Sequence, residues 1–404
     1  MKKRRYIVLA VVVALAAGSY GFWKHRTANM ESRSPAGPPS DDQIEALQAL
    51  PYAQWSEHKA DPAHSGVTRY DRDAAYPGYN LYTNDEDEIY LLDMSGKRRH
   101  TWKVADGNNC EYAVLLEDGH LLTVCESLAL VKLDWNSNPV WRRKLRVHHD
   151  IEIMADGSIL TIVRDKPINY RSRRVIFDSV MRLSESGQPL DAWSTFQNVE
   201  KLRPFHQRSP LDTLPAKTPV GKVLYDYYHL NTVKLLPDTA LGRRDRRFQA
   251  GNLLICSRNT NMVAILDKAT REPVWSFGST ILEKPHFPVM LETGNILIFD
   301  NGFVRKSSRV LEIDPLTGKT VWEYTGSPPS SFFSPWQGSA QRLPNGNTLI
   351  CESNNGHVFE ISPNGTIAWE FWNPVMGKTK RKRKTIYRFL RLPTEMVETL
   401  LKTE

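Results

Sequence analysis

Short apolar segments recur along the chain after residue 75, and each follows a turn that contains Gly or Asn. Leu121–Val124 follows the turn at Gly119, for example, and Ile296–Ile298 follows the turn at Gly294. Short apolar runs bounded by such turns are typical of β-hairpins, and no helical period separates them. The pattern predicts an all-β fold.

A tryptophan marks the end of each repeated unit. The six tryptophans are Trp102, Trp141, Trp193, Trp275, Trp322 and Trp369. One interval, between Trp193 and Trp275, is longer than the others and leaves room for an insertion at about residues 203–221. Units of roughly 45 residues with four short strands are typical of β-propeller blades. We therefore expect a six-bladed β-propeller over residues 76–404.

The tail of the chain is expected to close this propeller. The first unit, Tyr79–Val104, has no segment before it that could form an innermost strand. The segment Tyr387–Pro393 matches Gly338–Pro344, which begins the preceding unit. Closing the ring removes exposed strand edges. The C-terminal segment should therefore supply the missing strand.

The N-terminal residues 1–27 have the pattern of a membrane anchor. Four Lys and Arg residues precede the uncharged segment Tyr6–Trp23, and Lys24 and Arg26 follow it. This charge asymmetry favours a cytoplasmic N-terminus and a periplasmic body. Small residues at Ala14–Ala16 leave a cleaved signal peptide as the alternative. We expect a retained single-pass anchor in the inner membrane, followed by a tether and lead-in segment over residues 28–75.

Charge and cysteine content narrow the function classes. The chain has 53 Lys and Arg against 45 Asp and Glu, a net charge of +8. Much of this excess lies at the N-terminus and in Lys378–Lys384, which we expect to be a solvated loop, so nucleic acid is not an expected partner. Four cysteines are too few for a disulfide scaffold. Buried free thiols are favoured, with Cys110 apart from the other three.

Aligning the units on their turn glycines places histidines at one repeated position. The starts of the innermost strands carry Glu111, His149, His229, His286, Gly338 and, on the tail, Tyr387. The ends of the second strands carry Glu126, Arg164, Arg258, Asn301 and Ser353. In an antiparallel hairpin these two positions lie at the same end. Three histidines and two arginines should therefore meet at one mouth of the central channel.

This combination of side chains suits the transfer of an anionic group. Neutral imidazole can act as a nucleophile and as an acid or base near pH 7. Arginine binds and stabilises an anion that carries several oxygens. A zinc-dependent hydrolase with three histidine ligands is an alternative. The positive charge of the arginines would repel a metal ion, but the carboxylates of Glu111 and Glu126 could offset this charge. A non-catalytic scaffold propeller is another.

The run His229-Leu230-Asn231, then Arg258, then His286-Phe287-Pro288 resembles the bacterial arylsulfate sulfotransferases, over about residues 79–393. Those enzymes are periplasmic six-bladed propellers. They transfer a sulfuryl group from a phenolic sulfate ester to a phenol through a sulfated histidine, without a nucleotide donor. The resemblance implies that His286 is the nucleophile and that His149, His229, Asn231 and Arg258 bind the anion. We expect either His229 or His149 to act also as the acid that assists the departing phenolate. It also implies a hydroxyl residue, here Ser339, and no cofactor.

Together with Arg164 and Tyr387 from the strand alignment, these residues form the expected site. Its partners would be an aryl sulfate donor and a phenolic acceptor. The chain differs from the larger enzymes of this kind in two respects. It has no separate N-terminal β-domain, and no close cysteine pair precedes His286.

Overall fold

The structure is a computed structural model that describes residues 56, 60–83, 87–105, 110–125, 128–207, 211, 216–217, 223–377 and 381–402. The chain divides into two units, Met1–Ala46 and Leu47–Glu404. The expected anchor Tyr6–Trp23 lies outside the described residues, as does Glu126. In the part that is described, no helix is long and apolar enough to cross a membrane.

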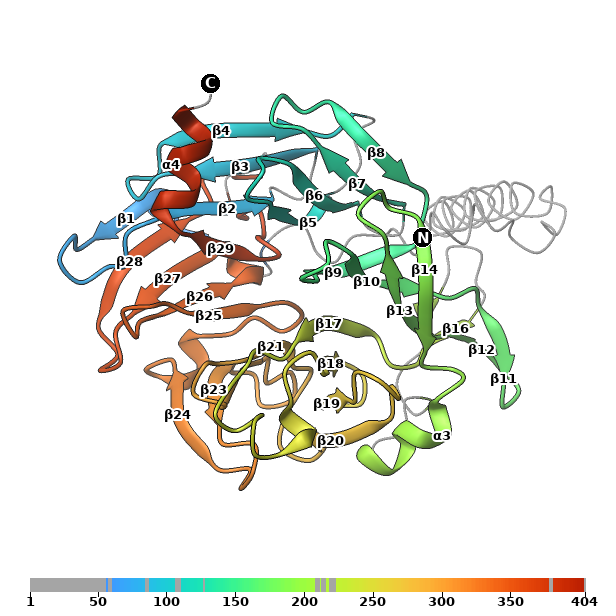
Figure 1. The fold of residues 1–404 in the computed structure, drawn as a ribbon. Coiled ribbons are helices and arrows are strands. Elements are labelled where there is room, and N and C mark those ends of the chain that lie inside the picture. Colours follow the sequence, from blue (N-terminus) through green and yellow to red (C-terminus); the bar gives the residue numbers. More distant parts are fainter. Residues whose placement is uncertain are drawn as a thin grey trace, which may run out of the picture. The chain divides into compact units, whose positions relative to one another are not determined.

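Six antiparallel sheets of similar build organise the described part of the chain (Figure 1). From innermost to outermost strand, the first is β29 (Phe389–Leu392), β2 (Tyr79–Thr83), β3 (Glu88–Leu92) and β4 (Arg98–Lys103), and the second is β5 (Cys110–Leu115), β6 (Leu121–Cys125), β7 (Ala129–Leu133) and β8 (Pro139–Arg143). The third is β9 (Val147–Ile153), β10 (Ile159–Arg164), β13 (Asp178–Leu183) and β14 (Pro189–Ser194), and the fourth is β17 (Leu230–Leu235), β18 (Leu253–Ser257), β19 (Met262–Leu266) and β20 (Pro273–Phe277).

The fifth sheet is β21 (His286–Met290), β22 (Ile296–Asp300), β23 (Arg309–Ile313) and β24 (Thr320–Thr325). The sixth is β25 (Ser339–Arg342), β26 (Thr348–Glu352), β27 (His357–Ile361), β28 (Ile367–Trp372) and a fifth strand, β1 (Gly66–Tyr70). The strand β1 precedes residue 76, where the sequence placed the start of the propeller, so the lead-in segment contributes to the last sheet.

Successive innermost strands contact each other around a central axis. β5 contacts β9, β9 contacts β17, β17 contacts β21, β21 contacts β25, and β25 contacts β29. β29 pairs with β2, from Tyr79 opposite Leu392 to Tyr82 opposite Phe389, and β2 contacts β5. The arrangement is propeller-like, and the predicted pairing of the tail with the first unit is confirmed.

The six repeat tryptophans all lie on the fourth strand of their sheet, counted from the innermost strand. Several of them join one sheet to the next through the indole N–H. Trp141 Nε1 donates to the carbonyl of Glu185, Trp275 Nε1 to that of Pro315, and Trp369 Nε1 to that of Met94. This contact accounts for the repeated tryptophan in three of the six units, whereas Trp102 and Trp193 have no hydrogen-bond partner at Nε1 among the described residues.

A further small sheet, which the sequence did not predict, combines two segments of the third unit with two segments in and just after the insertion. It consists of β11 (Ile168–Tyr170), β12 (Arg173–Ile176), β16 (Val223–Asp226) and β15 (Ala216–Lys217), and β12 pairs with β16 in parallel. The short helices are α3 (Val199–Leu202), η1 (Arg203–Phe205), η3 (Arg246–Phe248), η4 (Pro329–Ser331) and η5 (Ser353–Asn355).

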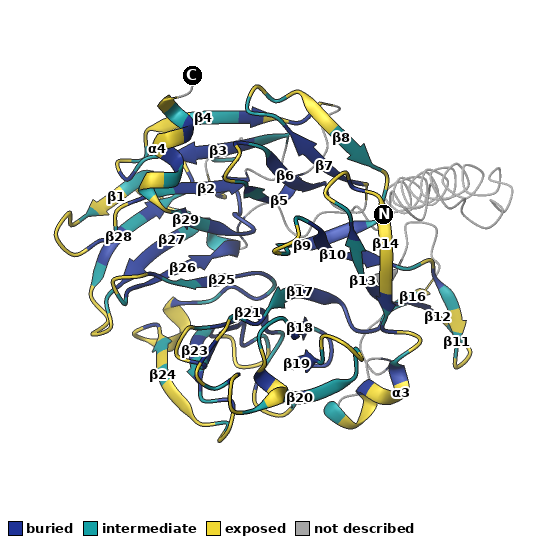
Figure 2. Ribbon diagram, viewed as in Figure 1, coloured by how far each residue is buried: buried dark blue, intermediate teal, exposed yellow. Residues whose placement is uncertain are grey.

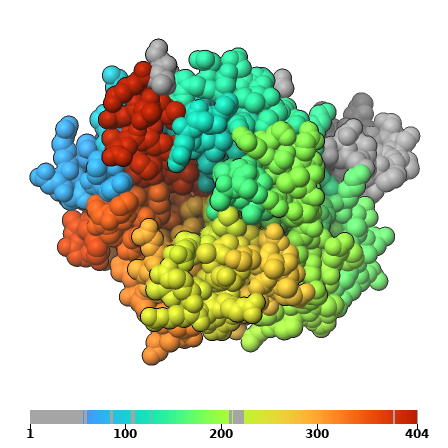
Figure 3. All heavy atoms as spheres, viewed as in Figure 1, coloured from blue at the N-terminus to red at the C-terminus, as the bar shows by residue number. Residues whose placement is uncertain are grey.

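The core lies within and between the sheets. Inner and middle strands are mostly buried, whereas outermost strands such as β14 and β24 expose much of their length (Figure 2). The C-terminal helix α4 (Thr394–Lys402) lies beside the strands of the first sheet (Figure 3). Its residues Val397 and Leu400 pack in one hydrophobic cluster with Trp102 of the first sheet and Leu121 of the second. The helix therefore contributes to the core between these two sheets.

All four cysteines are buried free thiols, as expected. Cys110 stands apart in the repeat, as expected, because it begins the innermost strand β5, whereas Cys125, Cys256 and Cys351 lie on second strands. It nevertheless lies opposite Cys125 on the neighbouring strand, with 3.1 Å between the two sulfur atoms. The sequence did not predict this contact.

Candidate active site

Four innermost strands carry a β-bulge near the same point. The pairing register shifts between Cys110 and Tyr112 in β5, between Leu230 and Thr232 in β17, and between His286 and Val289 in β21. In β9 the bulge consists of His149 and Asp150. A bulge twists its strand and redirects a side chain, and bulges are common beside active sites. His149 and His229 also have positive φ angles of 67° and 51°. Such backbone strain persists only where surrounding contacts enforce it.

His149 and His229 hydrogen-bond to each other across two neighbouring sheets. Their Nε2 atoms are 2.9 Å apart. Each ring turns its Nδ1 to a carboxyl group: that of His149 lies 2.7 Å from Glu111 Oε1, and that of His229 hydrogen-bonds to Asp226 Oδ2. Glu111 Oε2 also accepts the backbone N–H of His149 at 3.0 Å. Both rings are thus held at both nitrogens.

This arrangement does not fit the three-histidine zinc alternative. The Nδ1 atoms of His149 and His229 face carboxyl groups, as in many zinc-bound histidines, so the question is whether a third ligand joins these two rings. Among the described residues, no group of three or more His, Cys, Asp or Glu side chains is placed to hold a metal ion.

His286 begins β21 and is oriented by Asn301. Nδ1 of His286 lies 2.7 Å from Asn301 Oδ1 and 2.9 Å from the carbonyl oxygen of Lys284. Both partners are acceptors, so Nδ1 carries the proton and Nε2 carries the lone pair. Within the described part of the chain, both hydrogen bonds of the His286 ring involve Nδ1 and neither involves Nε2. The ring therefore presents one free nitrogen.

The histidines are neutral because they are buried among positive charges. Burial lowers the pKa of His149, His229 and His286 well below the usual histidine value, and the charge of Arg258 lowers it further. Arg164 adds to this effect at His149 and His229. A neutral ring keeps a lone pair, which nucleophilic attack requires. The two arginines and three histidines predicted from the sequence thus act on one another electrostatically.

The remaining predicted residues differ in their surroundings. Tyr387 stacks on His149, with 5.5 Å between ring centroids. Asn231 Nδ2 donates to the carbonyl of Pro285 at 2.8 Å, and its Oδ1 accepts from Thr232. Asn231 therefore holds β17 against the segment before His286, with one amide hydrogen left over. Ser339 lies opposite Cys351 in the sixth sheet, and both residues are buried.

A second buried pair adjoins the cluster and is absent from the residues predicted above. His148 Nε2 lies 3.1 Å from Asp178 Oδ1, and Asp178 Oδ2 accepts the backbone N–H of Leu230. Burial and the charge of Asp226 raise the pKa of Asp178 to about 8. The adjacent histidines at 148 and 149 were the available signal for this pair.

Arg388, on the tail, supports the strands that carry the histidines. Its Nη1 lies 2.6 Å from Asp150 Oδ1, and its Nη2 donates to the carbonyl of Asn231 at 2.7 Å. Both side chains of the ion pair are almost fully buried. The guanidinium also packs over the ring of Phe287, 4.3 Å from its centroid. One residue of the closing segment thus contacts the strands of His149, His229 and His286.

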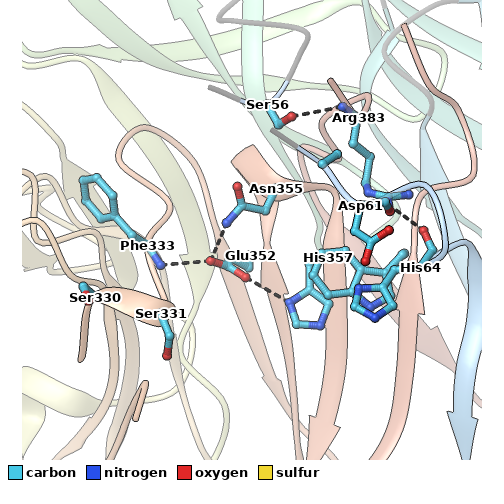
Figure 4. Close-up of a pocket in the computed structure, with 12 residues that line it drawn as sticks. Ser56, Asp61, His64, Ser330, Ser331, Phe333, Glu352, Asn355, His357 and Arg383 are labelled. Atoms are coloured by element: carbon cyan, nitrogen blue, oxygen red, sulfur yellow. Dashed lines mark hydrogen bonds and ion pairs between the residues drawn. The ribbon is translucent and has the colours of Figure 1, made fainter. Parts of the chain in front are cut away.

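A separate cavity of about 440 Å³ lies between the sixth sheet, the lead-in segment and the loop that holds Arg383 (Figure 4). His357 lines it and is bonded through Nδ1 to Glu352 and through Nε2 to Glu370, each at 2.9 Å. Arg383 and Lys384 are buried, so the expectation of a solvated loop is wrong at these two positions. The lead-in segment covers this end of the basic run, since Arg383 donates to the carbonyls of Asp61 and His64.

Comparison with known families and structures adds a family match. A family model described as "Arylsulfotransferase (ASST)" matches residues 112–374, more than half of the chain. A search of curated proteins finds no match. A solved structure of a protein of unknown function from Bacteroides caccae is 12% identical, with a TM-score of 0.50, over 78% of this chain and 98% of that one. A catalytically inactive virginiamycin B lyase from Staphylococcus aureus with quinupristin is 10% identical, with a TM-score of 0.43, over 76% of this chain and 88% of the other.

Proposed function

Since the chain belongs to the arylsulfotransferase family, we propose that it transfers a sulfuryl group from a phenolic sulfate ester to a phenolic acceptor through a sulfated His286. Family membership supports transferase activity of the sulfotransferase type in general. The histidine intermediate and the two phenolic partners are our proposal. No nucleotide sulfate donor and no cofactor enter the reaction.

The orientation of His286 carries the proposal. Its Nδ1–H is held by Asn301 and Lys284, and the lone pair on Nε2 is free to attack sulfur. The S–O bond to the phenolic oxygen breaks as the N–S bond forms, and the phenolate leaves. A second phenol then attacks the sulfur, which releases neutral His286. This sequence predicts ping-pong kinetics.

Arg258 and Arg164 are the proposed binding partners of the sulfuryl oxygens, together with the remaining amide hydrogen of Asn231. Charge spreads over these oxygens in the transition state, and fixed donors in a buried site stabilise it. Losing one such donor typically costs on the order of 100-fold in rate. Arg258→Lys should therefore lower turnover strongly, because an ammonium group cannot replace the planar guanidinium.

The test measures transfer from 4-nitrophenyl sulfate to phenol. His286→Asn should abolish transfer and labelling of the protein by a radioactive sulfate ester, with an unchanged melting temperature. His120→Asn is the matched control, since His120 pairs with Asp118 at the surface and should leave both readouts intact. Full activity in His286→Asn, or absence of label in the active wild type, would refute the histidine intermediate. Absence of transfer altogether would favour a scaffold protein.

For location and architecture, we propose a six-bladed closed propeller held in the periplasm by Tyr6–Trp23. The order of contacts between the innermost strands supports the ring, and the flanking Lys and Arg residues support the orientation. Protease added to spheroplasts should digest the body of the protein. Protection of the whole chain would contradict this orientation.

A further inference from the structure

Glu111, His149, His229 and Asp226 form a row joined by three hydrogen bonds. The row runs from Glu111 Oε1 to His149 Nδ1, from His149 Nε2 to His229 Nε2, and from His229 Nδ1 to Asp226 Oδ2. Each hydrogen bond requires one proton, so the row holds three. Two neutral imidazoles supply two of them. One further proton must lie on a carboxyl group or convert a ring to imidazolium.

The surroundings place this additional proton on Glu111. Burial raises the pKa of the Glu111 carboxyl, and burial lowers the pKa of both histidines. The two carboxyl groups also differ in access to water, because the Glu111 side chain is 4% exposed and that of Asp226 is 30% exposed. Charged and titratable groups that act on the row include His148, Arg164, Asp178, Arg258 and Arg388, and Tyr387 stacks on His149. The positive charges among them disfavour imidazolium.

The directions of the three bonds follow from this placement. Glu111 Oε1–H donates to His149 Nδ1, His149 Nε2–H donates to His229 Nε2, and His229 Nδ1–H donates to Asp226. Asp226 thereby fixes the tautomer of His229, whose lone pair accepts from His149. His149 is left with a proton on Nε2, the nitrogen that does not face a carboxyl group.

Building on the proposed function, we propose that Glu111 stores the proton that His149 delivers to the departing phenolate and later recovers from the acceptor phenol. In the first half-reaction, the Nε2–H of His149 leaves its hydrogen bond with His229 and gives its proton to the phenolate oxygen. His149 Nδ1 takes the proton of Glu111 Oε1, which leaves a carboxylate. In the second half-reaction, the acceptor O–H protonates His149 Nε2, and the Nδ1 proton returns to Glu111.

This cycle balances without any additional acid or base. The row loses one proton as the first phenol is released and regains it as the second sulfate ester forms. The Nδ1–H of His286 cannot serve this purpose, because Asn301 and a backbone carbonyl hold it and neither is basic. Glu111 is a positioning residue in this scheme, because it acts on the substrate only through His149.

Two donors that differ in their leaving group test the proposal. Nitrophenolate is stable without a proton, whereas unsubstituted phenolate needs one to leave rapidly. Glu111→Gln keeps a hydrogen-bonding group beside His149 but cannot release a proton to it. We expect transfer from phenyl sulfate to fall by roughly 100-fold or more, the usual range for general acid catalysis. Transfer from 4-nitrophenyl sulfate should fall only a few-fold. Equal loss with both donors would overturn the proposal.

A second measurement does not depend on turnover. Nitrogen NMR of the histidine side chains distinguishes which ring nitrogen is protonated. In the free wild-type protein, His149 should carry its proton on Nε2; a proton on Nδ1, or on both nitrogens, would overturn the proposal. Asp118→Asn, at the His120 pair, is the control that should leave the His149 signals unchanged. If the wild type transfers from neither donor, the proposed function fails, and the NMR result still decides where the proton lies.

Discussion

Asn301 fixes the ring of His286 through a neutral hydrogen bond of 2.7 Å from Nδ1 to Oδ1. The amide cannot turn around, because its Nδ2 donates to the carbonyls of Ser334 and Gln337 at 2.6 and 2.8 Å. The bond to this neutral acceptor raises the pKa of His286, but burial outweighs it, and a carboxylate in its place would raise the pKa further. The site thus combines a fixed tautomer with a low pKa of His286.

Replacing Asn301 with Asp should separate these two effects. A carboxylate beside Nδ1 stabilises imidazolium and raises the pKa of His286. The nucleophile would then be protonated over a wider range, so transfer should be lost at low pH and recover as pH rises. The pH profile of turnover checks this, with Asn136→Asp in an exposed turn as control. An acidic limb at the wild-type position would contradict the role given to Asn301.

The closing segment should be essential for stability. Removing residues 385–404 deletes β29, leaves Glu360 without Arg391, and leaves Asp150 with Lys234 but without Arg388. Breaking one buried pair costs about 3–5 kcal/mol, and a whole domain is stable by about 5–15 kcal/mol. The truncated protein should therefore not give a cooperative thermal transition.

A point variant tests the same contacts with less disruption. Arg391→Leu leaves Glu360 buried and uncompensated, so the melting temperature should fall by about 6 °C or more. Arg243→Leu is the control, because Arg243 and Asp238 form an exposed pair that contributes about 1 kcal/mol at most. Equal melting temperatures for the two variants would refute the importance of the buried pair.

Stability should depend on pH through His357. Burial alone would lower its pKa, but the bonds to Glu352 and Glu370 outweigh this and raise it. A raised pKa adds stability that is complete below the usual histidine pKa and is lost as pH rises through the folded-state value. Urea unfolding should show that His357→Gln lowers the free energy of unfolding more at about pH 5.5 than at about pH 9. The first pH lies below the usual histidine pKa and the second lies above it. A cost that does not change with pH would contradict this.

Cys110 and Cys125 should form a disulfide under oxidising conditions. Their sulfurs are 3.1 Å apart on paired strands, and a disulfide requires about 2.05 Å. Closing a loop of this length adds about 3 kcal/mol of stability. Peptide mapping without reductant should recover one linked pair and leave Cys256 and Cys351 as thiols. Four titratable thiols after exposure to oxidised glutathione would show that the strands do not allow the bond.

The repeat made much of this fold predictable. Aligned turn glycines located the sheets, and the match of Tyr387–Pro393 to an earlier unit identified the partner of β2. The same alignment selected His149, His229 and His286, because equivalent positions in a repeat occupy equivalent places. It could not show that two of these rings bond to each other, since that depends on the bulges and on positive φ angles.

Residues outside the repeat register were beyond this reasoning. Asp226 lies on β16 of the additional sheet, three residues before His229 and outside any aligned strand. Arg388 follows the aligned Tyr387 in the sequence, but its ion-pair partner Asp150 lies in β9 of the third sheet. No local sequence pattern indicates this pair. The proton assigned to Glu111 depends on burial and on neighbouring charges, which only the assembled structure reveals.

The bond between Arg388 and Asp150 joins residues 238 positions apart. Ribosomes build a polypeptide from its amino end, so all the histidines of the cluster are synthesised before the strand that supports them. A nascent chain that has not grown past Leu392 lacks the segment that pairs with β2. Translation products that stop before this segment therefore carry the reactive side chains without the assembled site, and synthesis of the segment is the step that allows the site to assemble.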